Sequence, residues 1–173
     1  GLGLWAQPRE PEPEASIEWL MPTAVVVLIA SSYLNGFLGE MGKDHYRIFK
    51  AAVVSLGKRM LGPSGPEFMR VSASGRRSTG SRFSIVYSLE AKTDDGHLVK
   101  LLFPKAVTEK ELTDAVEAFT DFLLDRDRAS GIIREHERLG LGPHRVLTSF
   151  NPESRRIEIV DPIPKEIRSR GAS

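Results

Sequence analysis

Hydrophobic positions follow a helical period in the first third of the chain and a period of two after it. Residues 19–39 contain no charged side chain. As a helix they would extend over about 30 Å, which is the thickness of a bilayer core. The pattern therefore predicts a long N-terminal apolar helix within residues 17–42, which either crosses a membrane or is buried in protein.

The next segment, residues 43–62, has the pattern of an amphipathic helix. Its apolar residues recur at steps of three and four, and most of the charged residues lie between them. A run of glycine, proline and serine over residues 62–66 then ends the helix and predicts a domain boundary. The apolar stripe consists of Ile48, Phe49, Ala52, Val53, Leu56 and Met60.

Beyond this boundary apolar and polar residues alternate, as they do in a half-buried strand. The apolar positions of residues 83–91 and 99–103 share one face if the loop between these strands has three residues and ends at Gly96. This register places Leu89 opposite Leu101. Gly96 would then supply the left-handed conformation that such a hairpin loop requires.

Helical spacing returns in the middle of the sequence. Thr108 and Glu111 form a capping-box pattern before an apolar stripe, which predicts a helix over residues 109–127. A second, short helix is expected over residues 130–139, where a glycine follows the last helical position.

The last structured part of the sequence reads as a second hairpin. Its strands are predicted over residues 146–150 and 156–160, and the turn between them begins with Asn-Pro. The order of elements contains no repeating strand–helix–strand series, which argues against a doubly wound parallel sheet. We therefore predict an α+β domain over residues 67–162, in which a small antiparallel sheet of two hairpins carries one or two packed helices.

Composition narrows the classes of function. The net charge of +1 is too small to produce an electric field that attracts a charged partner to the whole protein, so such a partner must bind a local charged patch. The absence of cysteine excludes disulfides, thiolate catalysis and cysteine-based zinc sites. Residues 1–16 alternate proline with glutamate and are expected to form a disordered acidic arm, and residues 163–173 are expected to form a flexible tail.

Signatures of catalysis are absent from the sequence. It has no nucleotide-binding loop and no Gly-x-Ser-x-Gly elbow, and its four histidines are scattered. His136 lies between two glutamates, but adjacent helical residues point about 100° apart and cannot converge on one metal ion. Carboxylate pairs at Asp94 and Asp95, or at Asp114 and Glu117, are candidate acid–base groups, yet turns and exposed helix faces ordinarily carry such residues. We expect no catalytic, cofactor-binding or metal-binding residue, and an enzyme is disfavoured.

Clustered arginines are the other candidate chemistry. Arg76, Arg77 and Arg82 flank a serine- and glycine-rich connector and form a candidate anion-binding loop. No aromatic platform or reading helix accompanies them, which argues against nucleic acid as a partner. Arg155 and Arg156 on the second hairpin are interpreted as solvated loop charge.

The apolar segment has an asymmetric charge environment. Glutamates precede it, and Lys43, Arg47 and Lys50 follow it. If the segment spans a membrane, the positive-inside tendency places the C-terminal domain in the cytoplasm. Small residues on one face of the segment predict a close helix–helix contact. These residues are Ser32, Gly36 and Gly39.

The sequence thus predicts a non-enzymatic, single-pass membrane protein that binds the lipid bilayer through its apolar helix. Its cytoplasmic α+β domain would bind a protein partner or a second copy of itself. One alternative is a soluble, cytoplasmic homo-oligomeric binding protein with the apolar helix buried at an interface. Another alternative is a small enzyme or a nucleic-acid binder that uses the Arg76/Arg77 loop.

Overall fold

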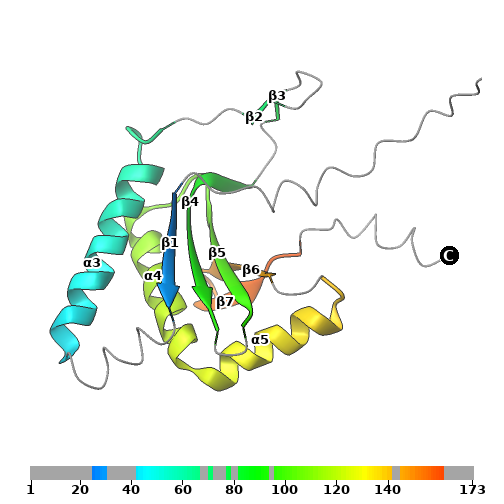
Figure 1. The fold of residues 1–173 in the computed structure, drawn as a ribbon. Helices are drawn as coiled ribbons and strands as arrows, with labels where there is room; N and C mark the ends of the chain where they lie inside the picture. The colour runs from blue at the N-terminus through cyan, green and yellow to red at the C-terminus, as the bar shows by residue number, and fades with distance from the viewer. Residues whose placement is uncertain are drawn as a thin grey trace, which may run out of the picture. The chain divides into compact units, whose positions relative to one another are not determined.

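The computed structural model describes residues 25–30, 42–66, 70–71, 77–78, 82–93, 96–141 and 145–161. Five strands form one sheet in the order β1-β4-β5-β6-β7, accompanied by three helices (Figure 1). A separate pair of very short strands contains β2 (Arg70–Val71) and β3 (Arg77–Ser78). The sheet strands are β1 (Val25–Ala30), β4 (Phe83–Lys92), β5 (Leu98–Pro104), β6 (Arg145–Asn151) and β7 (Arg156–Ile159), and the helices are α3 (Gly42–Leu61), α4 (Glu109–Leu124) and α5 (Arg126–Arg138).

The α+β class is confirmed, but the sheet is mixed and not antiparallel. The two predicted hairpins, β4–β5 and β6–β7, are both present. They join through a parallel pair, β5 and β6, and β1 is also parallel to β4. The reason lies in the connections. Helices α4 and α5 lie between β5 and β6, and this crossover carries the chain back to the end of the sheet where β5 began, so that β6 runs parallel to β5.

Strand β1 lies inside the stretch for which the sequence predicts an apolar helix. Four of its six residues are β-branched, namely Val25, Val26, Val27 and Ile29, and β-branched residues favour strands over helices. Residues 17–24 and 31–41, including Ser32, Gly36 and Gly39, lie outside the described residues, as do the arm 1–16 and the tail 163–173. Among the helices that the structure describes, none is long and apolar enough to cross a bilayer.

The core lies between the three helices and one face of the sheet. Strands β4 and β5 pair as predicted, with Leu89 opposite Leu101. The rings of Tyr87 and Phe103, on the same face, are 5.4 Å apart. Gly96 has a φ of 85°, which confirms the left-handed position in the loop. The core side chains contributed by these two strands are Tyr87, Leu89, Ala91, Val99, Leu101 and Phe103.

Helix α3 has a buried face that is rotated from the predicted one. Ile48 is 63% exposed and Ala52 is also exposed, whereas Val53 and Val54 enter the core. The face is set by contacts with α4 that involve polar residues. The Tyr46 hydroxyl donates a hydrogen bond of 2.8 Å to Thr120 Oγ1. This face of α3 also contains buried Gly57 and half-buried Lys50. A sequence pattern of large apolar residues does not identify such a face. Two ion pairs also link α3 to α4, namely Lys50–Glu117 and Lys58–Glu109.

Helices α4 and α5 are separated by a single residue. The capping box is confirmed, because Thr108 Oγ1 accepts from the Glu111 N–H and a Glu111 carboxylate oxygen accepts from the Thr108 N–H. Asp125 ends α4, and its side chain accepts from the Arg128 N–H to begin α5. The second helix therefore begins at Arg126 and not at residue 130 as predicted, because Asp125 is an N-cap. Gly140, at a φ of 63°, follows its end.

The β6–β7 hairpin turns where the sequence places it. Asn151 Oδ1 accepts hydrogen bonds from the backbone N–H groups of Glu153 and Ser154. Asparagine commonly closes turns in this way. Arg155, the last loop residue, has a φ of 53°. The loop thus places Arg155 and the first residue of β7, Arg156, at one end of the hairpin.

Candidate functional site

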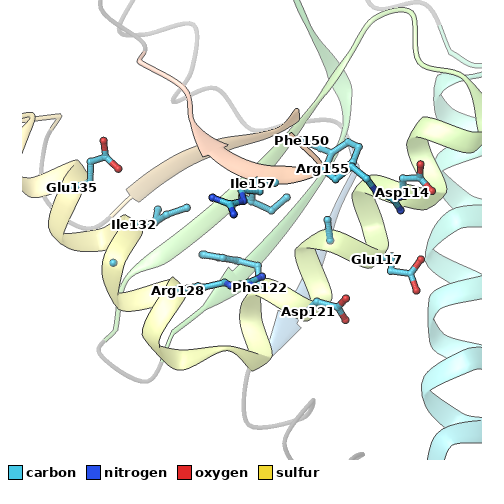
Figure 2. A pocket seen from close by; sticks show the side chains of 13 residues that line it. Asp114, Glu117, Asp121, Phe122, Arg128, Ile132, Glu135, Phe150, Arg155 and Ile157 are labelled. Carbon is cyan, nitrogen blue, oxygen red and sulfur yellow. The ribbon is translucent and has the colours of Figure 1, made fainter. Parts of the chain in front are cut away.

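A cleft of about 670 Å³ lies between α4, α5 and the β6–β7 hairpin (Figure 2). The volume is within the range of about 300–1,000 Å³ that is typical of binding sites. Its lining has an apolar floor and a charged rim. The lining residues are Asp114, Glu117, Ala118, Asp121, Phe122, Arg128, Gly131, Ile132, Glu135, Phe150, Arg155, Arg156 and Ile157.

The floor of the cleft comes from both helices and the hairpin. Figure 2 shows Phe122 of α4, Ile132 of α5 and Ile157 of β7 pointing toward one another. Phe122 and Ile157 are buried and belong to the core, and Ile132 and Phe150 pack against it. Gly131 leaves space beside them, because a Cβ added at this position would have no neighbour within 4 Å. The floor is therefore a continuation of the core that is open to solvent.

Helix α4 forms an acidic side of the cleft. Asp114, Glu117 and Asp121 recur at steps of three and four, which places them on one helical face. Glu117 accepts a hydrogen bond of 2.8 Å from the Lys50 ammonium, and Asp114 accepts one of 2.7 Å from Lys110. The bond from Lys110 holds the pKa of Asp114 below its ordinary value, although desolvation opposes this effect. Both carboxylates are therefore held by lysines.

The arginines of the cleft lie mainly on the hairpin. Arg128 is held by Asp125, with its Nε 2.9 Å from Oδ2. Arg155 and Arg156 differ, because neither guanidinium has an ion pair or hydrogen bond among the described residues. The Asp121 carboxylate on the acidic side is likewise without an ion pair within the described part of the chain. The rim therefore offers positive charge on the hairpin and negative charge on α4, and both can pair with a ligand.

The lining of the cleft consists of apolar, carboxylate and guanidinium side chains and one glycine. None of its residues carries a hydroxyl, thiol, imidazole or amine, so the lining contains none of the usual side-chain nucleophiles apart from carboxylates. Asp114 and Glu117, a candidate acid–base pair in the sequence, are separately committed to lysines. The lowered pKa of Asp114 makes this carboxylate poorly suited to donate a proton near neutral pH.

The other sequence candidates are not brought together at this cleft. Arg82 lies over the Phe83 ring, with its guanidinium carbon 5.6 Å from the centroid. Arg77 belongs to β3, while Arg76 and the Asp94–Asp95 pair lie outside the described residues. Glu135 faces the cleft, His136 is buried, and Glu137 lies 3.6 Å from His97 Nε2. Among the described residues, no three His, Asp or Glu side chains form a group that could hold a metal ion.

Sequence reasoning missed the role of Arg155 and Arg156, which line the cleft. The sequence did contain one signal of this site, because the spacing of Asp114, Glu117 and Asp121 places three carboxylates on one helical face. The contact between that face and the second hairpin depends on the parallel β5–β6 pairing, which the sequence pattern did not predict.

The chain was compared with protein-family models, curated proteins and solved structures, and none of these comparisons found a match.

Proposed function

We propose that this chain is a non-enzymatic binding domain that holds a segment of another protein in the cleft between α4, α5 and the β6–β7 hairpin. The observation that carries this proposal is an apolar floor with arginines on the hairpin side and carboxylates on the α4 side. Phe122, Ile132 and Ile157 offer the apolar contact. Arg155 and Asp121 form no ion pair among the described residues, although Arg155 interacts at longer range with Asp114 and Asp121 with Lys50.

The charges define the chemistry of the partner segment. It carries an apolar side chain that covers the floor, an acidic residue that meets Arg155 and Arg156, and a basic residue that meets Asp121. Burial of a large apolar side chain contributes about 1.5–3 kcal/mol, which makes the floor the main source of affinity. Complementary rim charges contribute mostly to orientation and association rate.

Two further parts of the sequence interpretation remain proposals. The membrane tether and the helix–helix contact depend on residues 17–42, of which the structure describes 25–30 as a strand and 42 as the start of α3. A strand in this position pairs with β4, which favours a role for the apolar segment within the protein. The alternative partner is a second copy of this chain. That copy would bind in the same cleft if it supplied the segment described above.

A peptide selection tests the proposal and identifies binding sequences in the same experiment. A displayed library of random 12-residue peptides is selected against the full chain. Enriched peptides are then measured by fluorescence anisotropy against Gly131→Leu, which fills the cleft, and Arg155→Glu, which reverses the rim charge. Arg134→Glu is the matched control, because Arg134 is an exposed arginine of α5 that does not line the cleft.

The expected result is a set of peptides that combine an apolar residue with an acidic residue. Their affinity should fall by about tenfold or more for Gly131→Leu and Arg155→Glu, since one such contact contributes about 1.4 kcal/mol. Arg134→Glu should change affinity by less than about twofold, the usual effect of a residue outside the contact. Peptides that bind Gly131→Leu as tightly as the unmodified chain would contradict the proposal, as would a selection without enrichment.

A further inference from the structure

The face of the sheet opposite the helices contains buried charge. Successive residues of a strand point to opposite faces, so Lys100 of β5 points away from its core neighbours Val99 and Leu101. The register places Glu90 of β4 opposite Lys100. Glu90 is 7% exposed and Lys100 is 3% exposed, although charged side chains are almost never fully buried unless they are paired.

The buried charges in this cluster do not balance. Arg145, at the start of β6, reaches Glu90, with its Nη2 3.6 Å from Oε1. Lys100 has neither a hydrogen bond to its ammonium nor an ion pair among the described residues. One carboxylate therefore faces two cations, and the cluster of Glu90, Lys100 and Arg145 has an excess of positive charge.

With no ion pair among the described residues, the Lys100 ammonium is available to an anion. Burial lowers the pKa of Lys100, the charge of Glu90 opposes this effect, and Arg145 lowers the pKa further. The ammonium offers three donors and the guanidinium offers five, and carboxylates and phosphates are the groups that such donors bind best. The cluster thus has excess positive charge, an ammonium without a hydrogen bond among the described residues, and side chains of low exposure, which together suit an oxyanion.

We propose that Lys100 and Arg145 form a binding site for a small oxyanion, a carboxylate or phosphate group, on the face of the sheet opposite the helices. Glu90 orients Arg145 and restricts the site to one anion, because it already neutralises one of the two cations. This site is independent of the proposed cleft, whose floor residues Phe150 and Ile157 belong to the helix-facing side of the sheet.

Thermal unfolding in the presence of defined anions tests this site. The full chain is titrated with sodium phosphate or sodium acetate at millimolar concentrations, and sodium chloride keeps the ionic strength constant. Binding to the folded state raises Tm with a saturable dependence on anion concentration. We expect a rise of several degrees that saturates for at least one of the two oxyanions, and the more effective anion identifies the preferred group.

Two variants and a direct measurement separate binding from general salt effects. Lys100→Met should abolish the saturable rise, whereas Lys92→Met, which removes an exposed cation from the neighbouring strand β4, should retain it. In the unmodified chain, the Nε–H resonance of Arg145 should shift with the same saturation concentration in NMR spectra. A Tm that responds equally to phosphate, acetate and chloride would overturn the proposal. An equal response of Lys100→Met would also overturn it, since phosphate stabilises many proteins through exclusion from their surface.

Discussion

Gly57 lies in α3 at the point where this helix contacts both the sheet and α4. A Cβ built on Gly57 would lie 3.0 Å from Tyr87 Cε1 and 3.1 Å from both terminal methyl carbons of Leu112. Carbon atoms pack at about 3.5–4.0 Å, so each contact is too short by about 0.5 Å. Neither neighbour can easily move. Tyr87 is fully buried and its hydroxyl donates a hydrogen bond of 2.9 Å to the Val53 carbonyl, and Leu112 is 2% exposed.

These distances predict the sign of Gly57→Ala. An alanine in a helix is favoured over glycine by about 0.5–1 kcal/mol, but an extra carbon in a packed core costs about 1–3 kcal/mol. We therefore expect a net loss in the free energy of unfolding of up to about 2.5 kcal/mol, with a middle value of about 1 kcal/mol. The matched control is Gly131→Ala in α5, where a Cβ has no neighbour within 4 Å and the variant should be more stable by about 0.5–1 kcal/mol.

Urea denaturation monitored by circular dichroism measures both variants. The loss in Gly57→Ala should diminish in a Leu112→Ala background, because the two sites are in contact and their effects are not additive. If Gly57→Ala stabilised the protein as much as Gly131→Ala does, α3 would not pack closely on Tyr87 and Leu112, and the described arrangement of α3 would be wrong.

The remaining predictions concern single residues of the fold. Arg155→Gly should stabilise by about 0.5–1 kcal/mol in urea denaturation, because glycine adopts the φ of 53° without strain; destabilisation would place the loop in another conformation. Gly96→Val should destabilise by about 1–2 kcal/mol, since a β-branched residue resists the φ of 85° there, and an unchanged urea midpoint would refute the loop geometry. Thr108→Ala should cost about 1 kcal/mol through loss of the N-cap, measured in the same way; equal stability would mean that the cap is not formed in solution. Lys100→Met tests the lowered pKa of Lys100, because the unfolded chain keeps this proton up to the ordinary pKa of 10.5. In anion-free buffer, the free energy of unfolding of the unmodified chain should therefore rise relative to that of the variant as pH rises toward 10.5. A difference between the two chains that is independent of pH would exclude a shift.

The features that the sequence predicts correctly are local. The capping box at Thr108 and the turn that begins at Asn151 depend on side chains and backbone groups within four residues of each other. The register of the β4–β5 hairpin follows from the period of two and the left-handed position of Gly96. Such features are determined by the chain segment itself, so a pattern of residues is sufficient to place them.

The features that the sequence did not predict depend on distant segments. The parallel β5–β6 pair is formed across the two helices of the crossover, and neither strand carries a signal of its direction. Helix α3 buries Gly57 because α4 and β4 approach it closely, which a single helix cannot indicate. Lys100 alternates with the apolar residues of its strand, as an exposed polar residue does, and its burial is visible only in the folded chain. The cleft likewise requires α4, α5 and the hairpin together.

Chemical-shift mapping can locate the protein segment that we propose binds in the cleft. Spectra of the ¹⁵N-labelled full chain are recorded during titration with a peptide obtained from the selection. We expect the largest shifts at Asp121, Ile132 and Ile157, and we expect them to saturate at the concentration measured by anisotropy. The largest shifts at the exposed face of α3 around Ile48, or at Lys100 and its neighbours, would contradict the proposal.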